Sequence, residues 1–259
     1  MELAELGLAT VVALVLAALV AGWVDAVVGG GALVQIPALL VLVPGATPVQ
    51  VLATNKISSV GGTVTSSVTY LRRVRPPLRT ALPMAALAFA GAAAGALCAG
   101  LLSPAVFRPL VLAGVLAVAV YVLRRPDLGE VTALRLTPRR HLAAAAAIGV
   151  GLGFYDGIFG PGTGSFLVFA LVGVLGYAFL EASAQARIVN LATNLGAIAV
   201  FAPQGAPLWG PGLCMCAAAV VGGYVGARTA IARGSRFVRV VFLVVVGALS
   251  LRLAYDILT

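Results

Sequence analysis

The sequence predicts an all-α, polytopic membrane protein, and two properties of the whole chain lead to this fold class. Its 259 residues are 61% hydrophobic and only 10% charged, and the mean hydropathy is +1.10. A soluble domain of this size has to cover its core with polar surface, which this composition does not supply. Apolar runs of roughly 20 residues, the length of a bilayer-spanning helix, recur from one end of the chain to the other.

The apolar runs divide the chain into ten helical segments, which we expect to form one transmembrane domain over residues 1–259. A long polar interruption at 124–140 separates a first repeat at 1–123 from a second repeat at 141–259, with five segments in each. The segments are predicted at 6–28, 32–43, 49–71, 78–101, 104–123, 141–159, 163–178, 181–201, 211–232 and 235–257.

The net charge of +9 indicates membrane topology rather than nucleic-acid binding, because the arginines gather in short loops between apolar runs. Cytoplasmic loops of membrane proteins carry an excess of basic residues. By this rule the loop from Arg72 to Arg79, the linker 124–140 and the turn from Arg228 to Arg236 are cytoplasmic. Their spacing fits ten passes with both termini outside, and five passes in each repeat would place the second repeat upside down relative to the first.

Two motifs appear twice and support this repeat. Residues 22–31 read GWVDAVVGGG and residues 153–162 read GFYDGIFGPG, while LATN occurs at 52–55 and again at 191–194. Aligning both motifs requires a length change in the loop between them, and it sets Lys56 against Leu195. The pairs Gly91/Gly95 and Gly222/Gly226 also correspond, and they suit close helix crossings. Inverted repeats of this kind are typical of secondary transporters.

Two predicted segments are too short to cross a bilayer alone. Segment 32–43 would form about 18 Å of helix, against roughly 30 Å of hydrocarbon, and segment 163–178 is also short. Each is therefore expected either to follow a break and turn back at mid-membrane or to complete a full crossing. The loop charges do not separate these alternatives, because both deliver the next segment to the same side.

The glycine-rich breaks are candidate anion sites. Non-helical backbone at membrane depth is tolerated where it is buried in protein or lines a cavity. We expect helices to begin after the breaks, at Ala32 and Thr163, with their N-terminal amides and partial positive charge available to an anion. A packing kink without a ligand is the alternative. The candidate substrate-binding residues of the two breaks and the turns that follow them are Gly29, Gly30, Gly31, Gln35, Gly160, Gly162, Thr163 and Ser165.

Charged residues inside apolar segments are the second group of candidates. Lys56 is the only lysine, and it could attract an anion, pair with Asp25 or extend to the membrane interface. Arg187 is a weaker candidate, because it lies near the presumed cytoplasmic end of its segment. Asp25 and Asp156 precede the breaks. Either carboxylate could carry a coupling proton, ligate sodium, cap freed amides or neutralise Lys56.

Polar side chains at helical spacing complete the candidate site. Asn190, Thr193 and Asn194 share one helix face and, with Thr54 and Asn55, could hydrogen-bond a substrate, the broken backbone or each other. The three cysteines and the single histidine show no metal-ligand spacing, so neither a metal nor a cofactor is expected.

At these motifs the chain resembles the sulfite exporter TauE/SafE family of membrane transporters over nearly its whole length. The matching pieces are GWVDAVVGGG with Gln35, ATNK at 53–56, GFYDGIFGPGTGS and the second LATN. The resemblance implies a carrier in the bacterial plasma (inner) membrane for a small sulfur-containing anion such as sulfite, sulfoacetate or a related organosulfonate.

Several alternatives to this carrier stay open. A channel for an anion or metabolite is one, and an intramembrane aspartyl protease is another, although the G-x-G-D motif of that class is absent. The sequence contains no Walker A pattern, which argues against a primary pump. A homodimer would be compatible with the apolar faces.

Overall fold

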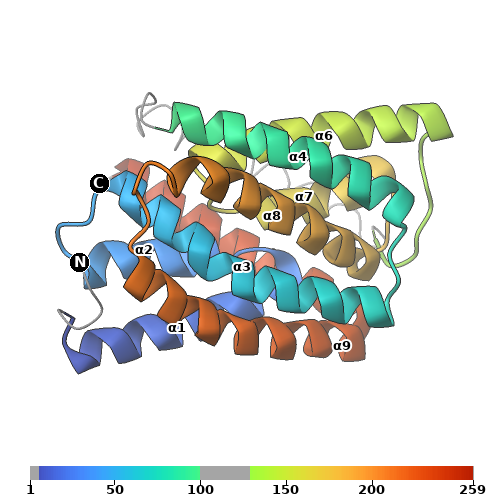
Figure 1. Ribbon diagram of the computed structural model, residues 1–259. Helices are drawn as coiled ribbons and strands as arrows, with labels where there is room; N and C mark the ends of the chain where they lie inside the picture. Colours follow the sequence, from blue (N-terminus) through green and yellow to red (C-terminus); the bar gives the residue numbers. More distant parts are fainter. Residues whose placement is uncertain (1–5, 100–128, 259) are drawn as a thin grey trace.

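Helices make up almost all of the part of the chain that the structure describes. The structure is a computed structural model that describes residues 6–99 and 129–258, so the predicted segment 104–123 and the first part of the linker lie outside it. No strand occurs within those two ranges (Figure 1), which confirms the all-α fold class for them. The helices are α1 (Leu8–Val28), α2 (Ala32–Leu42), α3 (Pro48–Arg73), α4 (Leu78–Cys98), α6 (Pro138–Ile158), α7 (Thr163–Ala170), the π-helical turn η2 (Leu171–Leu175), α8 (Phe179–Phe201) and α9 (Trp209–Leu258).

Four of these helices are long and apolar enough to cross a membrane. They are α1, α4, α6 and the Trp209–Val245 part of α9, which confirms a multi-pass membrane protein. Helix α9 joins two predicted segments, and Gly234 lies between them with φ 73°. Glycine adopts this backbone conformation readily, so a bend at Gly234 separates the two segments where the sequence predicts a turn.

Helices α3 and α8 form the centre of the molecule. In Figure 1, α4 and α6 lie along the upper edge, α1 and α9 along the lower edge, and α3 and α8 between them. The outer helices expose large apolar side chains such as Leu16 and Leu82. Most of the buried polar side chains belong to α3 and α8 instead. Polar groups are tolerated in these two helices because the surrounding helices shield them from lipid.

Both short helical segments turn back toward the start of the helix that precedes them. Leu39 and Val43, at the end of α2, share an apolar cluster with Leu14 from the first half of α1. The residue after η2, Gly176, accepts a 2.8 Å hydrogen bond from the amide of Ala133, just before α6. Of the two alternatives that the sequence left open, the structure therefore has the turn back in both places.

Helix starts in the two halves are separated by a nearly constant interval. It is 131 residues from Ala32 to Thr163, from Pro48 to Phe179 and from Leu78 to Trp209. The prediction that the loop between the two motifs differs in length between the halves is therefore wrong. Helices α3 and α8 keep the interval, so the two LATN tetrads occupy different positions along them. Lys56 therefore corresponds to Arg187 rather than to Leu195.

The close helix crossings repeat at the same interval. Gly91 of α4 packs against the backbone of Val150 on α6, and Gly222 of α9 packs against the backbone of Leu19 on α1. A Cβ atom at either glycine would overlap the facing carbonyl oxygen. The prediction that these small residues allow close crossings is confirmed.

Candidate functional site

The two glycine-rich breaks meet inside the molecule. Helix α1 ends at Gly29, whose φ of 84° is the left-handed conformation that commonly ends a helix. Helices α2 and α7 begin at Ala32 and Thr163, as predicted. The amide of Ser165 donates a 2.8 Å hydrogen bond to the carbonyl oxygen of Gly29, so the start of α7 rests on the end of α1.

Glycine is required where the breaks touch. A Cβ atom at Gly29 would overlap the backbone of Gly164, and a Cβ at Gly164 would lie 2.5 Å from the Cα of Gly29. The hydroxyl of Ser165 spans the same junction, because it donates to the carbonyl oxygens of Val28 and Gly29 at 3.1 and 3.0 Å. It thereby satisfies carbonyls that the end of α1 leaves without helical partners.

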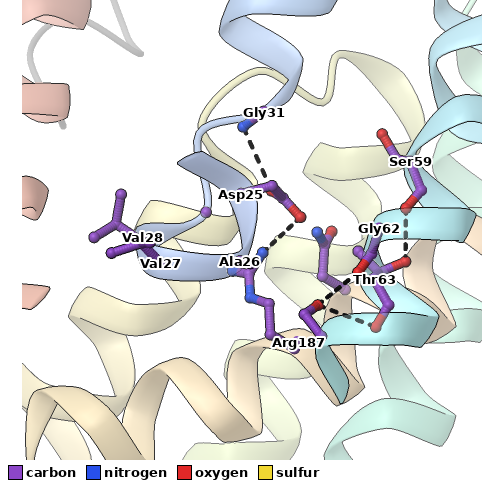
Figure 2. Close-up of polar contacts among 12 residues, drawn as sticks. Asp25, Ala26, Val27, Val28, Gly31, Ser59, Gly62, Thr63 and Arg187 are labelled. Carbon is purple, nitrogen blue, oxygen red and sulfur yellow. Dashed lines mark hydrogen bonds and ion pairs between the residues drawn. The ribbon is translucent and has the colours of Figure 1, made fainter. Parts of the chain in front are cut away.

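The first buried ion pair joins α1 to α8. Nη1 of Arg187 lies 2.7 Å from Oδ2 of Asp25, and Oδ1 of Asp25 accepts a 3.4 Å hydrogen bond from the amide of Gly31 (Figure 2). The Arg187 side chain is fully buried. Its Nη2 lies against both breaks, since a Cβ at Gly29 or Gly164 would lie within 2.7 Å of it. Arg187, which the sequence places near one end of its segment, is thus completely buried against the breaks.

The second buried ion pair joins α3 to α6. Nζ of Lys56 lies 2.7 Å from Oδ2 of Asp156, and both side chains are 3% exposed. Two alternatives for Lys56 are thus wrong in this structure, namely pairing with Asp25 and extending to the membrane interface. The reason is the fold: Arg187 already occupies the carboxylate of Asp25, and α3 is buried from Ala53 to Ser58.

The two ion pairs cross between the halves of the chain. Asp25 and Asp156 are 131 residues apart, and so are Lys56 and Arg187. Each half therefore supplies the carboxylate of one pair and the cation of the other. Buried charges are costly unless they are paired, and removing one partner typically destabilises a protein by about 3–5 kcal/mol.

A small polar cavity lies between the breaks and the two central helices. Its volume of about 20 Å³ leaves room for about one water molecule. Residues from both halves line it, and most of the predicted site residues are among them. The lining consists of Asp25, Gly29, Gly31, Ala32, Asn55, Lys56, Ser59, Asp156, Gly160, Gly162, Thr163, Gly164, Asn190 and Asn194.

Six predicted site residues do not line this cavity, namely Gly30, Gln35, Thr54, Ser165, Arg187 and Thr193. Three of them hold neighbouring groups in place. Gln35 accepts a 2.7 Å hydrogen bond from Nδ2 of Asn55 and so orients that amide. The hydroxyl of Thr54 accepts from the amide of Leu208, before α9, at 2.9 Å. Arg187 lies behind the breaks, against the carboxylate of Asp25.

Sequence analysis did not single out three lining residues, Ala32, Ser59 and Gly164. The constant interval between helix starts would have identified Ser59, because it corresponds to Asn190. Ser59 also lies one helical turn after Asn55, on the same face of α3. Ala32 and Gly164 have no polar side chain, and they line the cavity only through their places at the starts of α2 and α7.

The cavity offers hydrogen-bond donors to an anion. Nδ2 of Asn194 is buried and has no hydrogen-bond partner among the described residues. Lys56 contributes an ammonium group, and Gly31, Ala32 and Thr163 bring the starts of two helices to the wall. A buried donor without a partner is costly, so a ligand with acceptor oxygens would stabilise this arrangement.

Comparisons with known proteins agree on a family. The sequence pattern of the family described as "Sulfite exporter TauE/SafE" matches residues 14–253. "Probable membrane transporter protein ORF9" of Sinorhizobium sp is 37% identical over 244 residues, covering 94% of this chain and 92% of that protein. "Probable membrane transporter protein YfcA" of Escherichia coli is 33% identical over 239 residues, covering 92% and 87%. No solved structure matches the chain significantly.

Proposed function

Because this chain belongs to the sulfite exporter TauE/SafE family of membrane transporters, we propose that it is a secondary carrier for a small sulfur-containing anion. Sulfite, sulfoacetate and related organosulfonates are the substrate class, and export across the bacterial inner membrane is the direction. The family and its relatives indicate a transporter rather than an enzyme.

One observation carries the proposal, namely the set of donors around the cavity between the two breaks, which has to widen before an anion can enter because its volume is about 20 Å³. It combines the ammonium group of Lys56, the amide donor of Asn194 and the starts of α2 and α7. Helix N-termini and buried cations both favour negative charge. Oxyanions such as sulfite and sulfonates present three oxygens that can accept hydrogen bonds from several directions at once, which suits donors arriving from both halves of the chain.

Alternating access is supported by the way in which the two halves match. The interval of 131 residues recurs in three pairs of helix starts, in the two ion pairs and in the close glycine crossings. We take the halves to be inverted repeats that rock against each other around the cavity, as in other carriers with broken helices. Asp25 and Asp156 are the proposed ion-coupling residues, because they are the carboxylates in the cavity wall.

A channel is the second candidate, and counterflow separates it from a carrier. Proteoliposomes loaded with unlabelled sulfite should transiently accumulate labelled sulfite from outside if the protein is a carrier, because loaded sites return faster than empty ones. A channel lets label equilibrate without accumulation. A binding screen of sulfite, sulfoacetate, taurine, thiosulfate and simple carboxylates on the purified protein identifies the ligand, and binding of only cations or neutral solutes would contradict the proposal.

An intramembrane aspartyl protease fits the site less well. Asp25 and Asp156 do line one cavity, but each carboxylate lies 2.7 Å from its own cation. A protease dyad needs two carboxylates that share one proton. Whether the carrier forms a homodimer through its apolar outer faces stays a prediction, and the oligomeric state of the protein in detergent or nanodiscs would test it.

A further inference from the structure

The cavity already has balanced charges before any anion enters. Among the described residues, the ionic groups in the wall and directly behind it are two cations, Lys56 and Arg187, and two carboxylates, Asp156 and the partly buried Asp25. Arginine stays protonated in proteins. An anion entering this site therefore adds a negative charge to a neutral cluster in a region of low dielectric constant, where unbalanced charge is strongly unfavourable.

Only one of the two cations can be reached from the cavity. Lys56 lines the wall, whereas Arg187 lies behind the breaks and does not. An anion that binds Lys56 must approach the carboxylate of Asp156, which lies 2.7 Å from the same ammonium group and lines the same wall. The anion and the ionised carboxylate then compete for one cation and repel each other.

The two carboxylates are not equally dependent on their cations. Asp25 keeps the permanently charged Arg187 and also accepts a hydrogen bond from the amide of Gly31. Oδ2 of Asp156 has no hydrogen-bond partner among the described residues apart from its ion pair with Lys56. Once Lys56 turns to an anion, Asp156 loses the only cation with which it is paired in the described structure.

The other titratable groups near Asp156 do not change this balance. Tyr155 precedes it on α6, and its hydroxyl donates a 2.6 Å hydrogen bond to the carbonyl oxygen of Pro161. From α1, Asp25 faces the same cavity but is paired with Arg187. From α8, Asn190 and Asn194 bring uncharged amides. Lys56 is thus the single cation that the described chain offers to both the anion and Asp156.

We propose that the carrier takes up its anion together with one proton, and that the proton resides on the carboxyl group of Asp156. This inference rests on the proposed function and deepens it. The proton removes the repulsion between Asp156 and the anion and restores a neutral site. Because anion and proton bind together, they cross the membrane in the same direction, and a singly charged anion crosses without net charge movement. The membrane potential then does not act on export, which is driven by the outward gradient of the substrate and opposed by any pH gradient that is alkaline inside.

Proton uptake during binding tests the proposal directly. The probe is methanesulfonate, which stays singly charged over the range used, so protons that disappear from solution have been bound by the protein. The purified full-length protein is mixed with methanesulfonate in weak buffer containing a pH indicator, and the dissociation constant is measured by calorimetry at several pH values. We expect about one proton taken up per anion bound and an affinity that falls as the pH rises, by at most about tenfold per pH unit.

Two matched variants assign the proton. Asp156→Asn should bind without proton uptake and with affinity independent of pH, whereas Asp25→Asn should keep the uptake even where its overall affinity is lower. Loss of uptake in Asp25→Asn with retention in Asp156→Asn would overturn the assignment. If Asp156→Asn does not fold, the wild-type measurement decides alone, because binding without uptake overturns the proposal. Binding of no sulfonate at all would instead contradict the proposed function.

Discussion

Nζ of Lys56 lies 2.7 Å from Oδ2 of Asp156, and this ion pair forms part of the wall of a cavity to which both halves of the chain contribute. The equivalent pair, Arg187 with Asp25, has the same 2.7 Å separation, but only its carboxylate lines the wall and its cation lies behind the cavity. The two pairs are thus alike in chemistry and different in access. From that difference we propose that Lys56 binds the substrate and Arg187 supports the fold, and the predictions below follow from this proposal.

Lys56→Met should lose at least tenfold of the affinity for the anion, because the only cation in the cavity wall is removed. Folding should survive, since methionine fills similar space. Calorimetry with sulfite measures the affinity, and a thermal unfolding curve checks the fold. Unchanged affinity in a folded Lys56→Met protein would show that the anion does not use this cation.

Arg187→Met should mainly lower stability. It leaves Asp25 buried beside the breaks without its cation, a loss of about 3–5 kcal/mol by analogy with other buried pairs. Lys56→Met and Arg187→Met make a matched comparison, because they remove equivalent cations from equivalent helix positions. A thermal shift measures the effect, and a fully stable Arg187→Met protein with abolished anion binding would place Arg187 in the substrate site instead.

The ion pair of Lys56 and Asp156 should show coupling in a double-mutant cycle. Each single change, Lys56→Met or Asp156→Asn, leaves a buried polar group without its partner, whereas the double variant removes both charges. The destabilisation of the double variant should therefore be smaller than the sum of the two single effects, by about 0.5–3 kcal/mol. Strict additivity in reversible unfolding measurements would mean that the two groups do not interact in the folded protein.

Gly164→Ala should disrupt the junction of the breaks, because the added Cβ would lie 2.5 Å from the Cα of Gly29 and 2.7 Å from Nη2 of Arg187. Gly151→Ala is the matched control. Gly151 is an exposed helical residue with nothing within 4 Å of its added Cβ, so alanine there should be neutral or stabilising by about 0.5–1 kcal/mol. Yield and thermal stability of the two variants compare the sites, and equal stability would show that the breaks do not need this close contact.

Ser59→Ala should weaken anion binding a few-fold, because Ser59 lines the cavity between the two breaks. The adjacent Ser58 is buried but does not line the cavity, and Ser58→Ala is therefore a control of identical chemistry. Both variants should fold normally. An effect of Ser58→Ala equal to or larger than that of Ser59→Ala would argue that the cavity is not the binding site.

The parts of the fold set by local chemistry could be predicted from sequence. The helix starts at Ala32 and Thr163 were predicted because glycine-rich stretches end helices and leave apolar segments too short to span. Thr47 and Gln50 form a capping box that begins α3 at Pro48, close to the predicted start at 49. These signals act over a few residues, so they can be read without knowing what packs nearby.

The partners of the buried charges could not be read in this way. Pairing of Lys56 with Asp156 depends on where α3 and α6 lie relative to each other, and that is decided by the packing of the whole bundle. The alignment of the two LATN tetrads was misleading for a similar reason. The identity of the tetrads favours an alignment that sets Lys56 against Leu195. The constant interval between helix starts instead aligns Lys56 with Arg187, which also carries a positive charge.

The central claim is that an anion binds between the two breaks, next to Lys56. An experimental structure of the protein with selenite, a heavier analogue of sulfite, tests it most directly, because anomalous scattering locates the selenium atom without ambiguity. The account predicts one strong peak within the cavity, with selenite oxygens in hydrogen-bond contact with Nζ of Lys56 and Nδ2 of Asn194. Selenium bound elsewhere on the molecule, with this cavity unoccupied under conditions in which selenite inhibits sulfite binding, would contradict it.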